Sequence, residues 1–201
     1  MRYIHTFVTA AALLALAATG GAQERGGRGG RGGRGGGFQL PPMLHITIAA
    51  FPDGGRIPDK FTCAAGQTSP SPAISWTGAP ANTQSFVLIM HDPDVVLGGA
   101  ATNDVLHWEI FDIPGDAKEL PEGVKAGDQA DGAKQNNQGN MPSYIGPCAP
   151  PGHGDHHYTF ELYALSAKLG LPANTPRPEL LNAMNGKVVA KGVYIGIFGQ
   201  K

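Results

Sequence analysis

The sequence lacks the short motifs that mark several common classes of enzyme. Its 201 residues contain no G-x-S-x-G or H-E-x-x-H sequence, and the glycines of residues 26–37 are not flanked by the strand and helix that a phosphate-binding loop requires. A serine nucleophile on a strand-to-helix turn, a helical zinc-protease site and a P-loop nucleotide site are therefore disfavoured. We expect a protein that binds without catalysing a reaction.

Positive charge is also scarce once the first 37 residues are set aside. The whole chain has a formal net charge of −1, but residues 38–201 carry two arginines and eight lysines against fifteen acidic residues, a net charge of about −5. A nucleic-acid-binding core needs a basic surface, so nucleic acid is not an expected partner. Any anion bound here must be held by a local group of side chains.

No apolar run is long enough to form a stable membrane span. The run Phe7–Ala18 follows Arg2 and precedes small residues at positions 20–22. A short apolar core between a positive start and small residues is typical of a signal peptide, here residues 1–22 with cleavage after Ala22. The mature protein is then expected to be periplasmic or secreted, whereas an uncleaved segment would serve as a membrane anchor.

Residues 23–37, QERGGRGGRGGRGGG, form a low-complexity segment. Such a segment buries too little apolar area to offset the entropy lost on ordering, so we expect a disordered linker rich in arginine and glycine. Spaced guanidinium groups also occur in RNA-binding segments. Export, and the presence of only four arginines, favour instead a flexible tether that makes weak contacts with anionic surfaces.

The remaining residues, 38–201, suit one compact domain that is rich in strands. Apolar, aromatic and β-branched side chains predict strands at His45–Ala50, Ser85–Met90, Leu106–Ile113, Tyr158–Leu165 and Val193–Phe198. A helix is expected around Pro178, with an apolar stripe at positions 180, 181, 184, 188 and 189. The pattern indicates a mainly β fold, an antiparallel β-sandwich-like domain with a few short helices.

Polar side chains lie beside three of these strands. Residues 91–94, His-Asp-Pro-Asp, directly follow the second strand, His107 lies within the third, and His156-His157 precede the fourth. Loops at one end of a sheet commonly gather such groups around one pocket. Strand alternation places His156 and Tyr158 on one face and His157 on the other. We therefore expect a single pocket lined by histidines.

A metal site is the main alternative for the segment GHGDHH at residues 152–157, which is dense in potential ligands. Adjacent histidines of a strand point to opposite faces, however, and cannot easily share one ion. We therefore expect neither a resident metal ion nor any other cofactor.

The two cysteines, Cys63 and Cys148, leave two interpretations open. After an export signal they can form one disulfide, which would close a long loop. The alternative is a pair of buried free thiols, because the sequence does not supply the distance between their Cα atoms.

Several stretches of residues 38–201 together resemble one known protein family. They are FTCAAGQTSPSPAISW (61–76), SFVLIMHDPD (85–94), LHWEIFDIP (106–114), ELPEG (119–123), YIGPCAPPGHGDHHYTFELYAL (144–165) and the end of the chain. In order and approximate spacing they resemble the phosphatidylethanolamine-binding protein family, specifically its bacterial Raf-kinase-inhibitor-like branch. The resemblance covers nearly all of residues 38–201.

The resemblance implies a β-sandwich-like fold with a small anion pocket at one end of a central sheet. It implies non-enzymatic binding of a phosphate-type or other anionic headgroup, including that of a phospholipid, and it also allows a regulatory or inhibitory role towards a protein partner such as a protease. Alternatives are a pure protein-interaction module and a hydrolase using the Asp/His cluster. The implied ligand-binding residues are Asp92, His107, Tyr144, Gly146, Cys148, Pro150, His156 and Tyr158.

The sequence departs from the family pattern at three places. His157 stands where the family commonly has arginine, and Val95-Val96 stand where it usually has Ala-Pro. Val105 and Leu106 replace an aromatic residue that often precedes the pocket histidine. These departures suggest a ligand preference that differs from that of better-known relatives.

Overall fold

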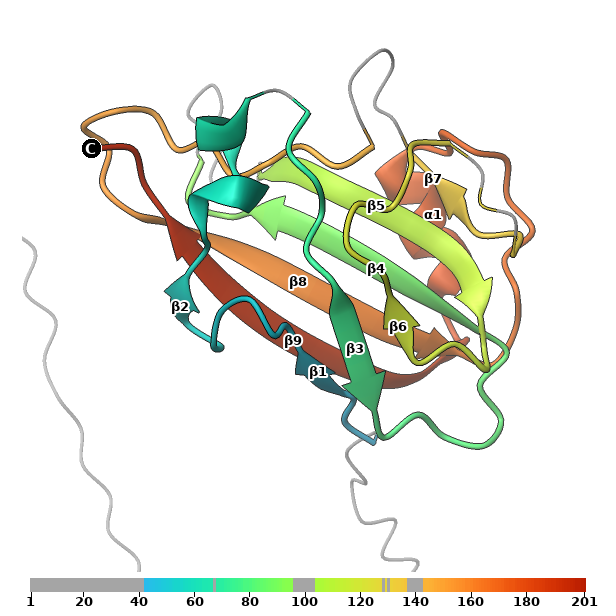
Figure 1. The fold of residues 1–201 in the computed structure, drawn as a ribbon. Coiled ribbons are helices and arrows are strands. Elements are labelled where there is room, and N and C mark those ends of the chain that lie inside the picture. Colours follow the sequence, from blue (N-terminus) through green and yellow to red (C-terminus); the bar gives the residue numbers. More distant parts are fainter. Residues whose placement is uncertain (1–41, 67, 96–103, 128, 130, 137–142) are drawn as a thin grey trace, which may run out of the picture. The chain divides into compact units, whose positions relative to one another are not determined.

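The larger of two β-sheets runs through the centre of the domain. In the computed structural model, which describes residues 42–66, 68–95, 104–127, 129, 131–136 and 143–201, this sheet has six strands. Their bounds are β2 Gly55–Arg56, β4 Ser85–Asp92, β5 Val105–Pro114, β7 Lys134–Gln135, β8 His156–Leu165 and β9 Val188–Phe198. The order across the sheet is β2-β9-β8-β4-β5-β7, with the long strands antiparallel and only β2 parallel to its neighbour (Figure 1).

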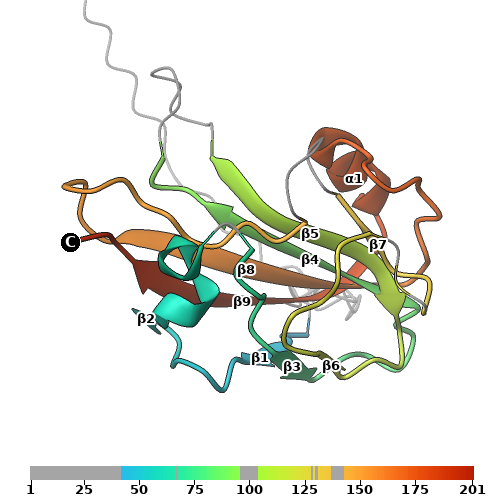
Figure 2. The same cartoon turned by 45° about the horizontal axis from the view of Figure 1, so that its top comes forward.

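A smaller sheet and one helix cover the two faces of the larger sheet. The smaller sheet has the order β1-β3-β6, from His45–Thr47, Ile74–Thr77 and Glu119–Leu120. Helix α1, Arg177–Met184, lies on the opposite face, so the larger sheet forms the middle layer (Figures 1 and 2). Two 3-10 helices, Asp59–Phe61 and Cys63–Ala65, lie near the end where β8 begins.

Two hydrophobic cores follow from this layering. Phe86, Leu88 and Met90 of β4 pack between the two sheets, together with Trp76 from β3. The alternate residues of β4, Val87 and Ile89, pack with Leu180 and Met184 of α1 on the other side. Since both faces of β4 are covered, all its residues from 85 to 90 are buried, as expected for a continuous apolar strand.

The mainly β, sandwich-like fold predicted from the sequence is confirmed, but several predicted boundaries were wrong. The second predicted strand continues to Asp92, and the last two begin earlier than predicted, at His156 and Val188. The first strand ends at Thr47 instead of residue 50. The helix ends at Met184, and Val188 and Val189, which fitted its apolar stripe, belong to β9. Gly186 lies between the helix and β9 with a φ of 74°, a left-handed backbone conformation that cannot continue a helix.

The described residues belong to one compact unit, Gln39–Lys201. The predicted signal peptide at residues 1–22 and the linker at residues 23–37 lie outside the described residues. Within the described part of the chain, no helix is both long and apolar enough to cross a membrane.

Candidate functional site

A β-bulge at the beginning of β5 determines which way His107 faces. Met90 of β4 pairs with Trp108, but the next residue, His91, pairs with Leu106, so His107 is an extra residue without a partner in β4. Such a bulge reverses the normal alternation at one point. His107 and Trp108 therefore both contact residues on the side of the smaller sheet: the His107 ring meets Tyr158 edge-on at 5.0 Å between centroids.

Asp92 and His156 form a buried pair at the same end of the sheet. Nδ1 of His156 lies 2.8 Å from Oδ2 of Asp92, and the two residues are only 6% and 1% exposed. The other carboxylate oxygen of Asp92 accepts a hydrogen bond from the backbone N–H of Asp94, at 2.9 Å. Because an ionised carboxylate can only accept, Nδ1 of His156 carries a hydrogen and Nε2 is the atom left for a ligand.

His107 is engaged in a similar way by the backbone. Its Nδ1 lies 2.8 Å from the carbonyl oxygen of Ile145, so Nδ1–H donates and Nε2 of the neutral ring is an acceptor. Burial lowers the pKa of His107 below the usual 6.5, and the Ile145 carbonyl and the Asp92 carboxylate offset this only in part. His107 is therefore a neutral side chain at neutral pH, and it becomes a second donor at Nε2 only in acid.

Tyr158 completes the group of four converging side chains. Its hydroxyl oxygen accepts a hydrogen bond of 3.1 Å from the backbone N–H of Cys148. Burial raises the pKa of Tyr158 well above 10, and the charge of Asp92 raises it further, so the hydroxyl keeps its proton. This end of the sheet thus combines one carboxylate, two imidazoles and one neutral phenol.

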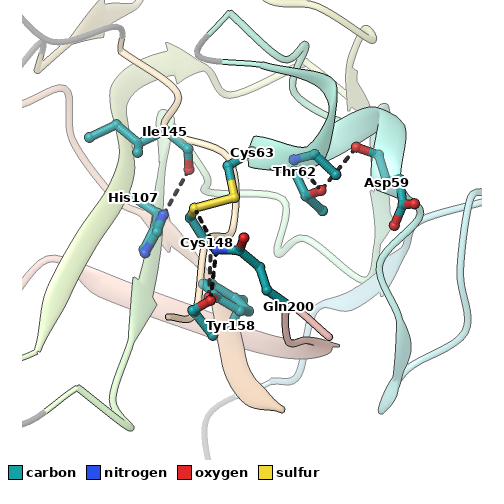
Figure 3. Close-up of a disulfide and its surroundings, with 10 residues drawn as sticks. Asp59, Thr62, Cys63, His107, Ile145, Cys148, Tyr158 and Gln200 are labelled. Atoms are coloured by element: carbon teal, nitrogen blue, oxygen red, sulfur yellow. Dashed lines mark hydrogen bonds between the residues drawn. A yellow bond between two sulfur atoms is a disulfide. The ribbon is translucent and has the colours of Figure 1, made fainter. Parts of the chain in front are cut away.

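The loop before β8 forms one wall of this site (Figure 3). A disulfide joins Cys148 of the loop to Cys63 of a 3-10 helix, with 5.3 Å between the Cα atoms. The backbone N–H of Cys63 also donates to the carbonyl of Pro147 at 3.0 Å. Of the two interpretations left open by the sequence, the bridge is therefore the one the structure contains. Gln200, after β9, adds a further support by donating to the carbonyl of Ala149 at 3.0 Å.

Two predicted wall residues support the loop from behind. The Tyr144 hydroxyl donates to the carbonyl of Phe61 at 2.8 Å, and its ring packs edge-on against Trp108. Gly146 passes so close to a neighbouring segment that an added Cβ would lie 2.4 Å from Oγ of Ser69. Tyr144 thus anchors the loop and does not present its hydroxyl as a free donor, and Gly146 permits the close approach.

The remaining predicted residues lie at the surface. Pro150 and Cys148 are exposed, and so is His153, whose ring centroid lies 6.3 Å from that of His156. His157 faces away from His156, as the strand alternation predicted, and its Nδ1 lies 2.8 Å from Oδ2 of Asp94. The residues that sequence reasoning missed are Ile145, which contributes only a carbonyl, and Asp94 as the partner of His157.

A hollow of about 400 Å³ lies apart from these four side chains. Its lining residues are Arg56, Asp59, Ala64, Phe198, Gly199, Gln200 and Lys201. The Arg56 guanidinium is already paired with Asp155 at 3.2 Å and with the carbonyl of Gly199 at 3.0 Å. The chemistry of the converging carboxylate, imidazoles and phenol makes their end of the sheet the better candidate site.

Comparison with known proteins identifies the family of the chain. The family model described as phosphatidylethanolamine-binding protein matches residues 47–199. The chain belongs to this family. Among its relatives, a phosphatidylethanolamine-binding protein homologue from Chlamydia trachomatis has a solved structure with a TM-score of 0.67 and 29% sequence identity, covering 79% of this chain and 99% of that one.

Two further relatives extend the family comparison. YbcL of E. coli, described as a new member of the mammalian phosphatidylethanolamine-binding protein family, has a TM-score of 0.68 and 25% identity, covering 79% of this chain and 99% of its own. The UPF0098 protein of Aquifex aeolicus is 38% identical over 158 residues, 78% of this chain and 88% of that protein. The phosphatidylethanolamine-binding protein fold therefore accounts for nearly the whole described part of the chain.

Proposed function

We propose that this member of the phosphatidylethanolamine-binding protein family binds a phosphate-type anionic headgroup between His107, His156 and Tyr158, without covalent chemistry. The observation that carries the proposal is the engagement of both imidazoles at Nδ1 by fixed acceptors, Asp92 and the Ile145 carbonyl. No described residue forms a hydrogen bond with Nε2 of either ring. Both Nε2 atoms therefore remain for a ligand.

Phosphate oxygens suit this arrangement chemically. A protonated imidazole donates from Nε2 to an anion in a charge-assisted hydrogen bond, and the Tyr158 hydroxyl keeps its proton. A neutral His107 can instead accept from the O–H of a singly protonated phosphate or from a ligand ammonium group. Asp92 would repel an anion at close range, but its oxygens already hold His156 and the Asp94 amide.

The site of action that we propose is outside the cytoplasm. The Cys63–Cys148 disulfide supports this, because disulfides persist mainly in oxidising compartments. The predicted signal peptide would deliver the protein to the periplasm or beyond. A protease would then be the more accessible protein partner, and a cytoplasmic kinase the less accessible one.

Replacing His156 with alanine is expected to weaken the binding of inorganic phosphate by about tenfold or more, because charge-assisted hydrogen bonds are worth roughly 1.5–3 kcal/mol. Isothermal titration with inorganic phosphate measures the effect. Phosphoethanolamine and vesicles containing phosphatidylethanolamine, used as further probes, distinguish a free phosphate from a lipid headgroup. His45→Ala is the matched control, since His45 is exposed in the smaller sheet. Equal affinity of wild type and His156→Ala would refute the proposed site.

Anion affinity is expected to rise as the pH falls below about 6.5, because His107, whose pKa is lowered by burial, then gains a proton and becomes a donor at Nε2. Sulfate is the suitable probe, since its own charge is constant in this range. His107→Asn retains a donor for the Ile145 carbonyl but cannot titrate, so its sulfate affinity should rise less between pH 7 and pH 5. Parallel pH profiles of the two proteins would contradict a role for His107 protonation.

A further inference from the structure

A polar cluster lies on the helix-facing side of the larger sheet, opposite the candidate site. Nδ1 of His91 lies 2.5 Å from Oδ2 of Asp104, and Nε2 of His91 lies 3.9 Å from Oε2 of Glu161. The side chains of His91 and Asp104 are only 15% and 24% exposed. The contact becomes an ion pair when the imidazole is protonated, and partial burial weakens the screening of that pair by water.

Arg177, the first residue of helix α1, binds the Asp104 carboxylate of this contact. The Arg177 guanidinium donates to both oxygens of Asp104, at 2.8 and 3.0 Å, which is the two-point geometry that arginine and carboxylate form best. Burial opposes ionisation of Asp104, but the hydrogen bonds and charge of Arg177, with a contribution from His91, outweigh it and lower the pKa of Asp104. Asp104 is therefore a fixed anion that joins α1 to the first residues of β5.

The His91–Asp104 contact crosses the two strands where their register shifts. His91 is followed by Asp92, which faces the candidate site, and it pairs with Leu106, the residue before the bulged His107. Asp104 directly precedes β5, whose first residue, Val105, pairs with Asp92. Moving a strand by one residue turns its side chains to the other face, so the register here decides whether His107 faces the site.

We propose that His91 and Asp104 are positioning residues for the anion site on the opposite face of the sheet. By joining the end of β4 to the start of β5, they hold the bulge that places His107 on the same side of the sheet as Asp92. The inference rests on the proposed function for its ligand. To the proposed function, the inference adds a pair of residues that do not contact the ligand but position the residues that do.

The test compares three substitutions in the full chain. His91→Leu removes the imidazole opposite Asp104, and His91→Lys places an ammonium group there. Lys191→Met breaks the ion pair with Glu161, the other carboxylate near His91, at 2.5 Å and leaves the His91–Asp104 contact in place. We expect His91→Leu to weaken sulfate binding by roughly five- to tenfold, corresponding to a coupling within the usual range for neighbouring residues. His91→Lys should bind within about twofold of wild type, and so should Lys191→Met.

A second measurement reports on the bulge without any ligand. The amide of Ile145 donates to the carbonyl of His107 at 2.8 Å, so its hydrogen exchange reflects how firmly the bulge is held. We expect faster exchange at Ile145 in His91→Leu than in wild type, restored in His91→Lys and unchanged in Lys191→Met. An overall loss of stability would instead accelerate exchange throughout the domain.

The outcomes separate the inference from the proposed function. Wild-type sulfate affinity and wild-type Ile145 exchange in His91→Leu would overturn the inference and leave the proposed site intact. Failure of the wild type to bind inorganic phosphate or sulfate would overturn the proposed function. In that event Ile145 exchange still decides whether His91 and Asp104 hold the bulge.

Discussion

Replacing Cys63 and Cys148 together with alanine is expected to lower the free energy of unfolding by about 3–4 kcal/mol, because the bridge closes a long loop and restricts the unfolded chain. The two cysteines are 85 residues apart in sequence. The native loop retains other supports in the variant, including the Cys63 N–H bond to Pro147 and the Gln200 bond to Ala149. The folded structure should therefore persist, and the loss should come mainly from the unfolded state.

Urea unfolding of the wild type and the double variant, monitored by tryptophan fluorescence, measures this difference. Wild type with the disulfide chemically reduced is the matched control and should resemble the double variant. A loss below about 1 kcal/mol would mean that the unfolded chain gains little freedom when the bridge is removed. It would also argue against the bridge as a main source of stability in this domain.

Replacing Glu109 with glutamine is expected to stabilise the protein at pH 8 by about 2–3 kcal/mol and to have little effect at pH 5. Glu109 is fully buried in β5, and its Oε2 has no hydrogen-bond partner among the described residues. Burial raises its pKa to about 7, and a bond of 3.3 Å from Asn136 and the charge of Arg177 offset this only in part.

The direction of the pH effect follows from the raised pKa. Below the ordinary value of 4.5, the carboxyl is protonated in both the folded and the unfolded state, so it contributes no pH-dependent cost. Between 4.5 and about 7 the unfolded state releases its proton first, and stability falls as the pH rises. Above about 7 the carboxyl is ionised in both states, so the loss of stability no longer changes with pH.

Chemical unfolding of wild type and Glu109→Gln at pH 5 and pH 8 measures the effect. Glu119→Gln is the control, because Glu119 is exposed in β6 and its charge is already solvated. An equal difference between Glu109→Gln and wild type at both pH values would show that ionisation of Glu109 does not limit stability.

The sequence was sufficient to predict the strands whose environment is uniform. The apolar run at residues 85–90 indicated a strand covered on both faces, and β4 is buried on both. The placement of His156 and Tyr158 on one face, with His157 on the other, required only the two-residue period of a strand, and the burial of β8 confirms it. Local periodicity was enough at these positions because nothing in β8 interrupts it until Leu165.

The direction of His107 could not be obtained from the same rule. Regular alternation along β5 would place His107 opposite to Trp108, whereas the bulge places both towards the smaller sheet. A bulge depends on pairing with another strand, so it has little signal within β5 itself. The carbonyl of Ile145 was missed for a related reason, because any residue type could supply that backbone oxygen.

The end of the helix shows how tertiary context overrides a periodic pattern. Val188 and Val189 fit the apolar stripe of a helix, but β-branched side chains fit a strand equally well. Pairing with β8 decides between the two, since Leu165 pairs with Val188 at the beginning of β9.

The bond between Gln200 and the Ala149 carbonyl makes the residues after β9 a support of the loop beside the candidate site. Gln200 also lies 3.4 Å from Sγ of Cys148, beside the disulfide. An affinity tag or reporter joined after Lys201 would therefore lie next to the wall of the proposed anion site. Tagged protein suits studies of that wall, whereas affinity measurements are better made after the tag has been removed.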